Sequence, residues 1–170
     1  MARALSFTNP WADPLGTGYQ LSNALMAFGR GEWFGTGLGH SVQKLSYLPE
    51  AHTDFMLAVL GEEFGFVGIS LVMVLSFGML ACCIKIGHRA LKHNFLRAGY
   101  LAYGISIIFL LQILVNAGMN MGLMPTKGLT LPFISYGGTS LMMCAAMISL
   151  VLKIDSSTQQ VNPNREESNF

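Results

Sequence analysis

The sequence predicts an all-α protein that crosses a membrane several times. Of its 170 residues, 52% are hydrophobic and only 11% are charged, a balance unlike that of soluble domains. Three stretches are also apolar over the length of about 20 residues that a helix needs to cross a bilayer. We therefore predict a polytopic membrane protein with three transmembrane helices. They follow a large extracytoplasmic loop that contains a short amphipathic helix.

The three predicted spans lie at residues 58–86, 98–121 and 133–153, with apolar centres at residues 64–84, 98–121 and 133–152. The remaining segments are a loop region at residues 1–57, linkers at residues 87–97 and 122–132, and a tail at residues 154–170. Because the tail is rich in Ser, Gln, Asn and Glu, it is predicted to be disordered.

The basic residues predict how the chain is oriented. The linker between the first two spans and its borders contain four basic residues and no acidic one: Lys85, Arg89, Lys92 and Arg97. Such linkers lie in the cytoplasm, which places residues 1–57 and 122–132 outside it. An external N-terminal region needs an export signal, and residues 1–9 have no apolar core of the signal-peptide kind. We therefore expect the chain to be the C-terminal piece of a larger membrane protein.

Charge and cysteine content limit the function classes. The net charge is +1 and the basic residues do not cluster, so nucleic-acid binding is not expected. Cys82, Cys83 and Cys144 lack the spacing of metal ligands and are interpreted as small apolar residues. The glycine-rich segment 35–39 lacks the strand-to-helix context of a phosphate-binding loop and is predicted to form a turn.

Two regular patterns predict helix surfaces. Apolar residues recur at helical spacing between Tyr19 and Phe28, which predicts the short amphipathic helix. In the second span, Gln112, Asn116 and Asn120 share one face. They could form a polar cavity wall or bond between helices, and we favour the second because such bonds commonly hold membrane bundles together. Five glycines predict close helix packing: Gly61, Gly65, Gly68, Gly118 and Gly122.

An acidic segment leads into the first span and ends with His52, Thr53 and Asp54. If a helix begins near Asp54, its carboxylate lies about 15 Å above the apolar run, in the headgroup layer. Asp54 is interpreted either as the helix N-cap or as a functional carboxylate. The density of ionisable groups argues against a cap alone, and Glu62 is expected on the same side of the helix as Asp54.

Three motifs are specific enough to indicate a family. They are Pro-Glu-Ala-His-Thr-Asp-Phe at residues 49–55, Gly-Glu-Glu-Phe-Gly at residues 61–65, and Pro-Thr-Lys-Gly-Leu-Thr-Leu-Pro at residues 125–132 followed by Ile-Ser-Tyr-Gly-Gly. They resemble the SEDS family, which includes FtsW, RodA and SpoVE, and the third motif is more similar to the FtsW branch. Phe64 replaces the usual Leu. The resemblance extends from about Ser6 to Ile154 and identifies the predicted spans as the eighth to tenth of ten.

The resemblance implies a peptidoglycan glycosyltransferase that polymerises lipid II during septal cell-wall synthesis. Asp54 then matches the general base that takes the proton from the C4 hydroxyl of the acceptor lipid II. That hydroxyl attacks the anomeric carbon of the growing glycan strand, and undecaprenyl diphosphate leaves. Because the first seven spans are absent, the isolated chain is expected to be inactive.

The same resemblance implies further site residues and partners. Arg30, Lys44 and Lys127 are candidates for contact with the diphosphate, with solvated surface positions as the alternative, and Glu50, His52 and Glu62 are candidates for positioning substrate. A divalent cation, Mg²⁺ or Mn²⁺, is a further expectation, and no organic cofactor is expected. The implied partners are a class B penicillin-binding protein and other divisome proteins, at the division septum of the bacterial inner membrane.

Two other functions stay open on the sequence. A lipid II flippase would use a polar path through the membrane, which the amide stripe of the second span could provide. A divisome scaffold would need no catalytic residue at all. Formation of polymer would distinguish the enzyme from both.

Overall fold

The computed structural model of the chain describes residues 19–39, 55–124 and 130–160. This part of the chain contains four helices and no strand: α2 (Tyr19–Gly31), α3 (Met56–Lys92), α4 (Leu96–Asn120) and α5 (Gly138–Gln160). The last three are long and apolar enough to cross a membrane. The predicted all-α fold with three spans is therefore confirmed. The predicted amphipathic helix is present as α2 and continues to Gly31.

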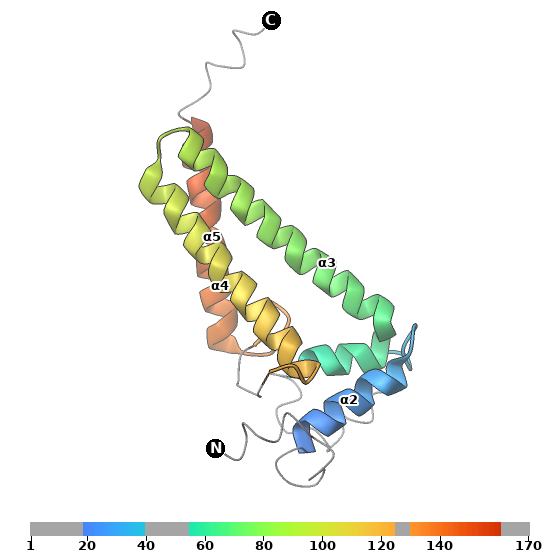
Figure 1. Cartoon of the computed structure of the whole chain (residues 1–170). Helices are drawn as coiled ribbons and strands as arrows, with labels where there is room; N and C mark the ends of the chain where they lie inside the picture. The colour runs from blue at the N-terminus through green and yellow to red at the C-terminus, as the bar shows by residue number, and fades with distance from the viewer. Residues whose placement is uncertain (1–18, 40–54, 125–129, 161–170) are drawn as a thin grey trace, which may run out of the picture.

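The three spans form a bundle in which α3 and α4 are antiparallel and α5 packs against both (Figure 1). Their shared core is apolar and contains Leu80, Cys83, Ile105, Phe109, Cys144 and Val151. The two cysteines in this core behave as the small apolar residues that the sequence predicted. At one end of the bundle, Arg89 Nη1 donates to Asp155 Oδ1 at 2.7 Å and joins α3 to α5. We call this end, which also contains Lys85 and Lys92, the basic end.

The linker between the first two spans is shorter than predicted. Helix α3 continues to Lys92, so residues 87–92 of the predicted linker are helical. Three residues remain between the helices, and the middle one, Asn94, has a positive φ of 64° that Asn tolerates better than most residues. The N–H groups of the other two, His93 and Phe95, both donate to the carbonyl of Ala90. This tight turn sets α4 antiparallel to α3.

The third span begins later than the predicted residue 133. Helix α5 starts at Gly138, and the residues before it form a turn. The Leu131 N–H donates to Ser135 Oγ at 2.8 Å, and Phe133 has a φ of 63°, which no α-helix contains. The apolar residues before α5 therefore belong to a partly buried loop, in which Leu131 and Pro132 are buried and Phe133 is exposed.

The prediction of a disordered tail from residue 154 is wrong for residues 154–160. Helix α5 continues to Gln160, and Ile154 and Thr158 are buried. The Thr158 hydroxyl donates to the Ile154 carbonyl at 2.7 Å, while Ile154 packs against Ala90 and Ala102. Packing against the α3–α4 turn thus outweighs the polar composition of this segment. The rest of the predicted tail lies outside the described residues.

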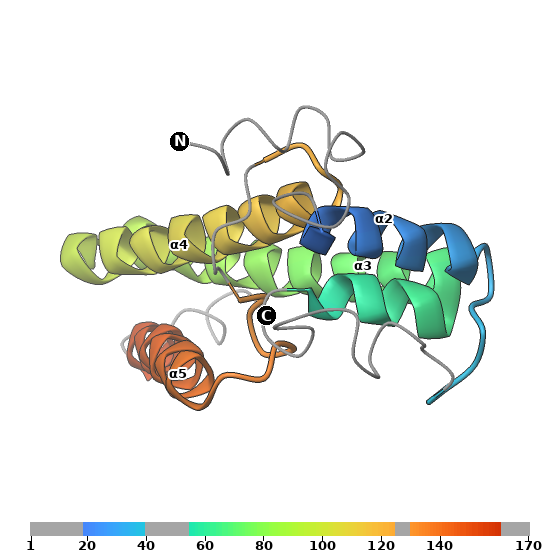
Figure 2. The ribbon, with the colours of Figure 1, turned by 90° about the horizontal axis from the view of Figure 1, so that it is seen from below.

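A break at Gly65 divides α3 into a short segment, residues 56–64, and a long segment, residues 66–92 (Figure 1). Gly65 has a φ of 66° and a ψ of −162°, a conformation that essentially only glycine adopts. The two segments point in different directions, and α2 lies alongside the short one (Figure 2). The sequence did not predict this break.

The turn after α2, residues 32–37, replaces the helical hydrogen bonds that are lost at the break. In an unbroken helix, the N–H groups of Phe66 and Val67 would donate to the carbonyls four residues earlier. Here they donate to the turn instead, Phe66 N–H to Glu32 O (2.9 Å) and Val67 N–H to Trp33 O (3.2 Å). The two carbonyls that lose these donors accept from the turn, Glu62 O from Thr36 N–H (2.9 Å) and Glu63 O from Gly37 N–H (3.1 Å). These bonds give partners to the N–H groups of Phe66 and Val67 and to the carbonyls of Glu62 and Glu63, which buried backbone groups require. We call residues 32–37 the bridging turn.

The bridging turn approaches the break so closely that glycine is required on both sides. A Cβ at Gly35 would overlap the carbonyl oxygen of Glu63, and a Cβ at Gly65 would lie 2.5 Å from the Gly35 nitrogen. Gly31 at the end of α2 meets the Gly61 carbonyl in the same way. The predictions of a turn around Gly35 and of close packing at Gly61 and Gly65 are confirmed.

Replacement of Gly35 by Ala should destabilise the fold more than the same replacement at Gly39. Both glycines have a φ of +79°, but a Cβ at Gly39 meets nothing within 4 Å. We expect Gly39→Ala to cost about 1–2 kcal/mol from backbone strain, and Gly35→Ala to cost roughly 1–3 kcal/mol more from overlap with Glu63. Thermal unfolding in detergent, followed by circular dichroism, measures both. Equal losses in the two variants would contradict the close approach.

Candidate functional site

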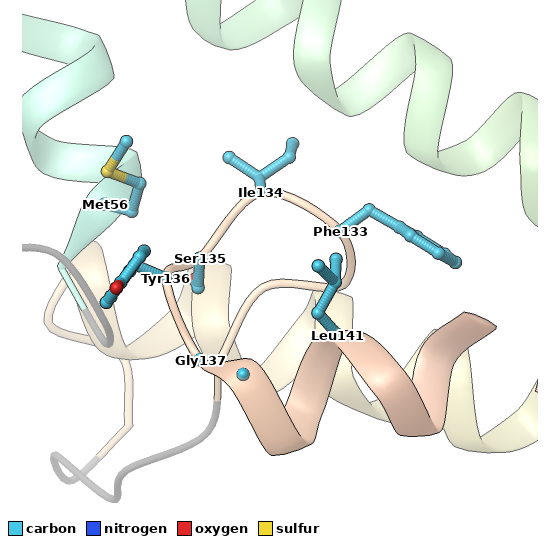
Figure 3. Close-up of a pocket in the computed structure, with 8 residues that line it drawn as sticks. Met56, Phe133, Ile134, Ser135, Tyr136, Gly137 and Leu141 are labelled. Atoms are coloured by element: carbon cyan, nitrogen blue, oxygen red, sulfur yellow. The ribbon is translucent and has the colours of Figure 1, made fainter. Parts of the chain in front are cut away.

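An open pocket of about 620 Å³ lies at the end of the bundle opposite the basic end (Figure 3). It lies between the start of α3 and the loop that leads into α5. Its lining consists of Met56, Phe133, Ile134, Ser135, Tyr136, Gly137, Gly138 and Leu141. Most of these residues are apolar, and the side-chain hydroxyls of Ser135 and Tyr136 are the polar exceptions.

Local hydrogen bonds fix the loop that forms the pocket wall. The Ser135 hydroxyl accepts the bond from Leu131, and the hydroxyls of Thr130 and Ser140 lie 2.7 Å apart. These bonds tie the loop to itself and to the first turn of α5. Tyr136 is left 81% exposed, so both its ring and its hydroxyl are accessible.

The pocket suits an amphipathic ligand. Met56 and Leu141 provide an apolar wall, and the exposed Tyr136 provides a ring face with a hydroxyl. Gly137 and Gly138 form the start of α5 at the pocket. The first N–H groups of a helix have no intrahelical partners and carry partial positive charge, which favours anionic or polar groups nearby.

Five of the predicted site residues lie outside the described residues: Lys44, Glu50, His52, Asp54 and Lys127. Their assigned roles therefore stay predictions, as does the choice between a capping and a catalytic Asp54. The N-cap position of α3 belongs to Phe55, which provides no side-chain cap bond. The next residue, Met56, lines the pocket.

The structure brings together two other predicted site residues, Arg30 and Glu62. Arg30 Nη1 lies 3.6 Å from Glu62 Oε1, and the Glu62 side chain is 1% exposed while that of Arg30 is 55% exposed. Neither residue lines the pocket beside Met56. The pair lies between the end of α2 and the short segment of α3, so its observed contact is structural.

The amide stripe of α4 is buried at its C-terminal end. Asn120 Nδ2 donates to the main-chain carbonyl of Asn116 at 2.9 Å and to its side-chain oxygen at 3.2 Å, and both asparagines are fully buried. Neither lines the pocket. Gln112 has a buried Oε1 without a hydrogen-bond partner among residues 19–39, 55–124 and 130–160. The asparagine end of the stripe is therefore packed inside the fold and is not a wall of this pocket.

In the described ranges, no three His, Cys, Asp or Glu side chains lie close enough together to hold a metal ion. The sequence also did not identify the pocket lining, of which Met56 and Tyr136 are the clearest members. The available signal was the motif Ile-Ser-Tyr-Gly-Gly at residues 134–138, whose two adjacent glycines oppose helix formation.

Comparison with known proteins gives consistent matches. The sequence model of the cell cycle protein family of FtsW, RodA and SpoVE matches residues 1–160. A relative from Acinetobacter baylyi, named probable peptidoglycan glycosyltransferase FtsW, is 92% identical over the whole chain, which covers 43% of that relative. A relative from Aliivibrio salmonicida with the same name is 56% identical over 91% of the chain and 39% of its own length. The chain thus spans about two fifths of these relatives.

A solved structure is also similar, with a TM-score of 0.70 and 29% sequence identity. The match covers 94% of this chain and 42% of the other. That structure is described as showing the structural coordination of polymerization and crosslinking by a peptidoglycan synthase complex. The similarity confirms that this arrangement of helices occurs as part of a longer chain.

Removal of the Arg30 charge should destabilise the fold through Glu62. Arg30→Gln takes the counter-charge from a buried carboxylate, and we expect a loss of about 1–2 kcal/mol, because the exposed side of Arg30 is screened by solvent. Arg30→Gln should cost much less in a protein that already carries Glu62→Gln, because no buried charge then loses its partner. Thermal unfolding of the four proteins gives the coupling free energy. Additive losses would show that the pair does not interact.

Proposed function

Because the chain belongs to the cell cycle protein family of FtsW, RodA and SpoVE, we propose that it is the C-terminal part of a peptidoglycan glycosyltransferase. The proposed reaction polymerises lipid II into glycan strands during septal cell-wall synthesis. The observation that supports it best is the 92% identity to the Acinetobacter baylyi relative, over every residue of the chain. The motif that contains Asp54 also leads directly into the helix that begins at the pocket.

Asp54 is the proposed general base. It precedes Met56 by two residues, and two residues of chain span at most about 7 Å. A ligand in the pocket would therefore lie within reach of the Asp54 segment. The carboxylate takes the proton of the C4 hydroxyl of the acceptor lipid II while the hydroxyl oxygen bonds to the anomeric carbon of the growing strand. The bond from that carbon to the diphosphate breaks, and undecaprenyl diphosphate leaves with the electron pair.

The pocket supports this reaction through its mixed lining. A lipid-linked saccharide has sugar hydroxyls next to a diphosphate and a long apolar chain. Tyr136 can stack on or bond to a sugar, while Met56 and Leu141 can contact apolar groups. We propose that Lys44 and Lys127 contact the diphosphate, and that Arg30 contributes through its exposed side while it remains paired with Glu62.

We propose that a divalent cation, Mg²⁺ or Mn²⁺, would be bound by Glu50 and His52. Both lie outside the described residues, and the described carboxylates do not form a ligand set. Carboxylate oxygens suit these hard cations, whereas the pocket lining offers only hydroxyls and main-chain groups. No step of the proposed reaction is therefore assigned to the cation.

The location and partners follow from the same proposal. The basic end faces the cytoplasm of the bacterial inner membrane at the division septum, so the pocket faces outward, where glycan strands are made. The similar structure comes from a peptidoglycan synthase complex that couples polymerization to crosslinking. We propose a class B penicillin-binding protein as the corresponding partner, together with other divisome proteins.

Replacement of Asp54 by Asn should abolish polymer formation. The chain is joined to the upstream part of the Acinetobacter baylyi relative, reconstituted with a class B penicillin-binding protein, and supplied with purified lipid II. We expect the rate of glycan-strand formation to fall by about 10²–10⁴-fold, the usual contribution of a general base. Electrophoresis of labelled strands measures the product.

Asp155→Asn is the matched control, because Asp155 pairs with Arg89 at the basic end, far from the pocket. Its polymer yield should stay near that of the unchanged protein. Undiminished polymer from Asp54→Asn would contradict the assignment of Asp54 as the general base. If neither the unchanged protein nor the control forms polymer, but labelled lipid II crosses the vesicle membrane, a flippase is favoured. Partner binding without polymer or transport favours a scaffold.

A further inference from the structure

A cluster of exposed apolar side chains lies where the bridging turn meets the break in α3. Trp33, Phe34 and Leu38 expose 67%, 84% and 73% of their surface, and Phe66 exposes 57%. The rings of Trp33 and Phe66 meet edge to face, with centroids 5.4 Å apart. We call these four residues the aromatic tip. A contiguous exposed cluster of this kind marks a surface that binds something apolar.

The aromatic tip is built into the fold by backbone hydrogen bonds. The Trp33 carbonyl accepts from Val67 N–H, and the Glu32 carbonyl accepts from Phe66 N–H. Glu32 also has a positive φ of 44°, which a non-glycine residue keeps only when its surroundings hold it there. An open hollow of about 530 Å³, lined by Glu32, Trp33 and Phe66, lies beside the ring pair. Exposure of the tip is therefore a property of the folded chain.

The tip continues an exposed apolar face of α3. Val67, Leu71 and Val74 lie at positions i, i+4 and i+7 and are 50–68% exposed. Only 11% of the most apolar window of α3 is buried. In a transmembrane helix such a stripe contacts acyl chains or a further helix. Phe66 precedes Val67 in the chain and contacts Trp33 through its ring, so exposed apolar side chains occur from the long segment of α3 to the tip.

Helix length indicates how deep the tip lies. Lys85 is the first charged residue after the break, and no charged residue lies between it and Phe66. The 19 residues from Phe66 to Lys85 rise by roughly 28 Å along the helix, and the hydrocarbon core of a bilayer is about 30 Å thick. If the basic end lies at one boundary of the hydrocarbon, the tip lies at the other.

We propose that the aromatic tip seats in the interfacial layer of the bilayer, between headgroups and acyl chains, on the side opposite the basic end. Trp33 suits this layer because its ring is apolar while its indole N–H can donate to water or to a lipid ester oxygen. Seated there, the tip fixes the depth of the bridging turn and of the short segment of α3. The pocket at the start of that segment is thereby held at a constant distance from the membrane.

Tryptophan fluorescence tests the depth directly. The chain has two tryptophans, Trp11 and Trp33, so Trp11→Phe leaves Trp33 as the only reporter. The protein is placed in vesicles of phosphatidylglycerol and phosphatidylcholine, with the phosphatidylcholine brominated either near the carbonyl end of its chains or at their methyl ends. We expect quenching about twofold stronger with the shallow bromines, because the interface lies ~15 Å from the bilayer centre.

A matched variant calibrates the measurement. Trp11→Phe/Trp33→Phe/Val74→Trp places the only tryptophan near the middle of the uncharged stretch between Phe66 and Lys85, and its quenching should be stronger with the deep bromines. The proposal is overturned if Trp33 is quenched equally by both lipids or more strongly by the deep bromines. Protection of Trp33 from both lipids and from iodide in water would also overturn it, because another protein surface would then cover the tip.

Discussion

The exchange of backbone hydrogen bonds at Gly65 is the constraint on which the rest of the structure depends. A helix interrupted at a membrane leaves N–H and C=O groups that each cost several kcal/mol when unpaired. The bridging turn provides partners for the carbonyls of Glu62 and Glu63 and for the N–H groups of Phe66 and Val67, and the Thr36 hydroxyl adds a second bond to the Glu62 carbonyl at 3.0 Å. Without this turn, α3 would be more stable as one straight helix of 37 residues, far longer than a bilayer requires.

The break determines where the candidate site can form. A straight α3 would carry Met56 away from the bundle along the helix axis, whereas the turned segment brings it to the loop before α5. Two contacts hold the segment in this direction, the backbone approach of Gly31 to Gly61 and the ion pair of Arg30 with Glu62. Both come from the end of α2. The pocket therefore depends on α2, although no residue of that helix lines it.

The sequence predicted the three spans because a bilayer accepts apolar helices of a narrow range of lengths, so hydropathy alone identifies them. The break escaped prediction because glycine is common in membrane helices and because its partners, residues 32–37, lie about thirty positions earlier. The start of α5 was predicted too early because the loop around Phe133 is as apolar as a span. For the site, the motif around Asp54 leads into the helix that begins at the pocket, and the roles of its residues stay predictions. Tyr136 did not stand out, since only the folded loop exposes it.

The two ends of the bundle differ in backbone regularity, and this difference bears on where polar chemistry can occur. Among the described residues, positive φ values occur at Glu32, Phe133 and five glycines near the pocket or the bridging turn, and at Asn94 alone near the basic end. Irregular backbone in contact with hydrocarbon is costly because its polar groups lack water. Its concentration at one end therefore favours a position of that end at the boundary of the membrane, where water can complete hydrogen bonds. The length of the uncharged helix from Phe66 to Lys85 is consistent with a bridging turn at the same boundary, which agrees with the proposed position of the pocket.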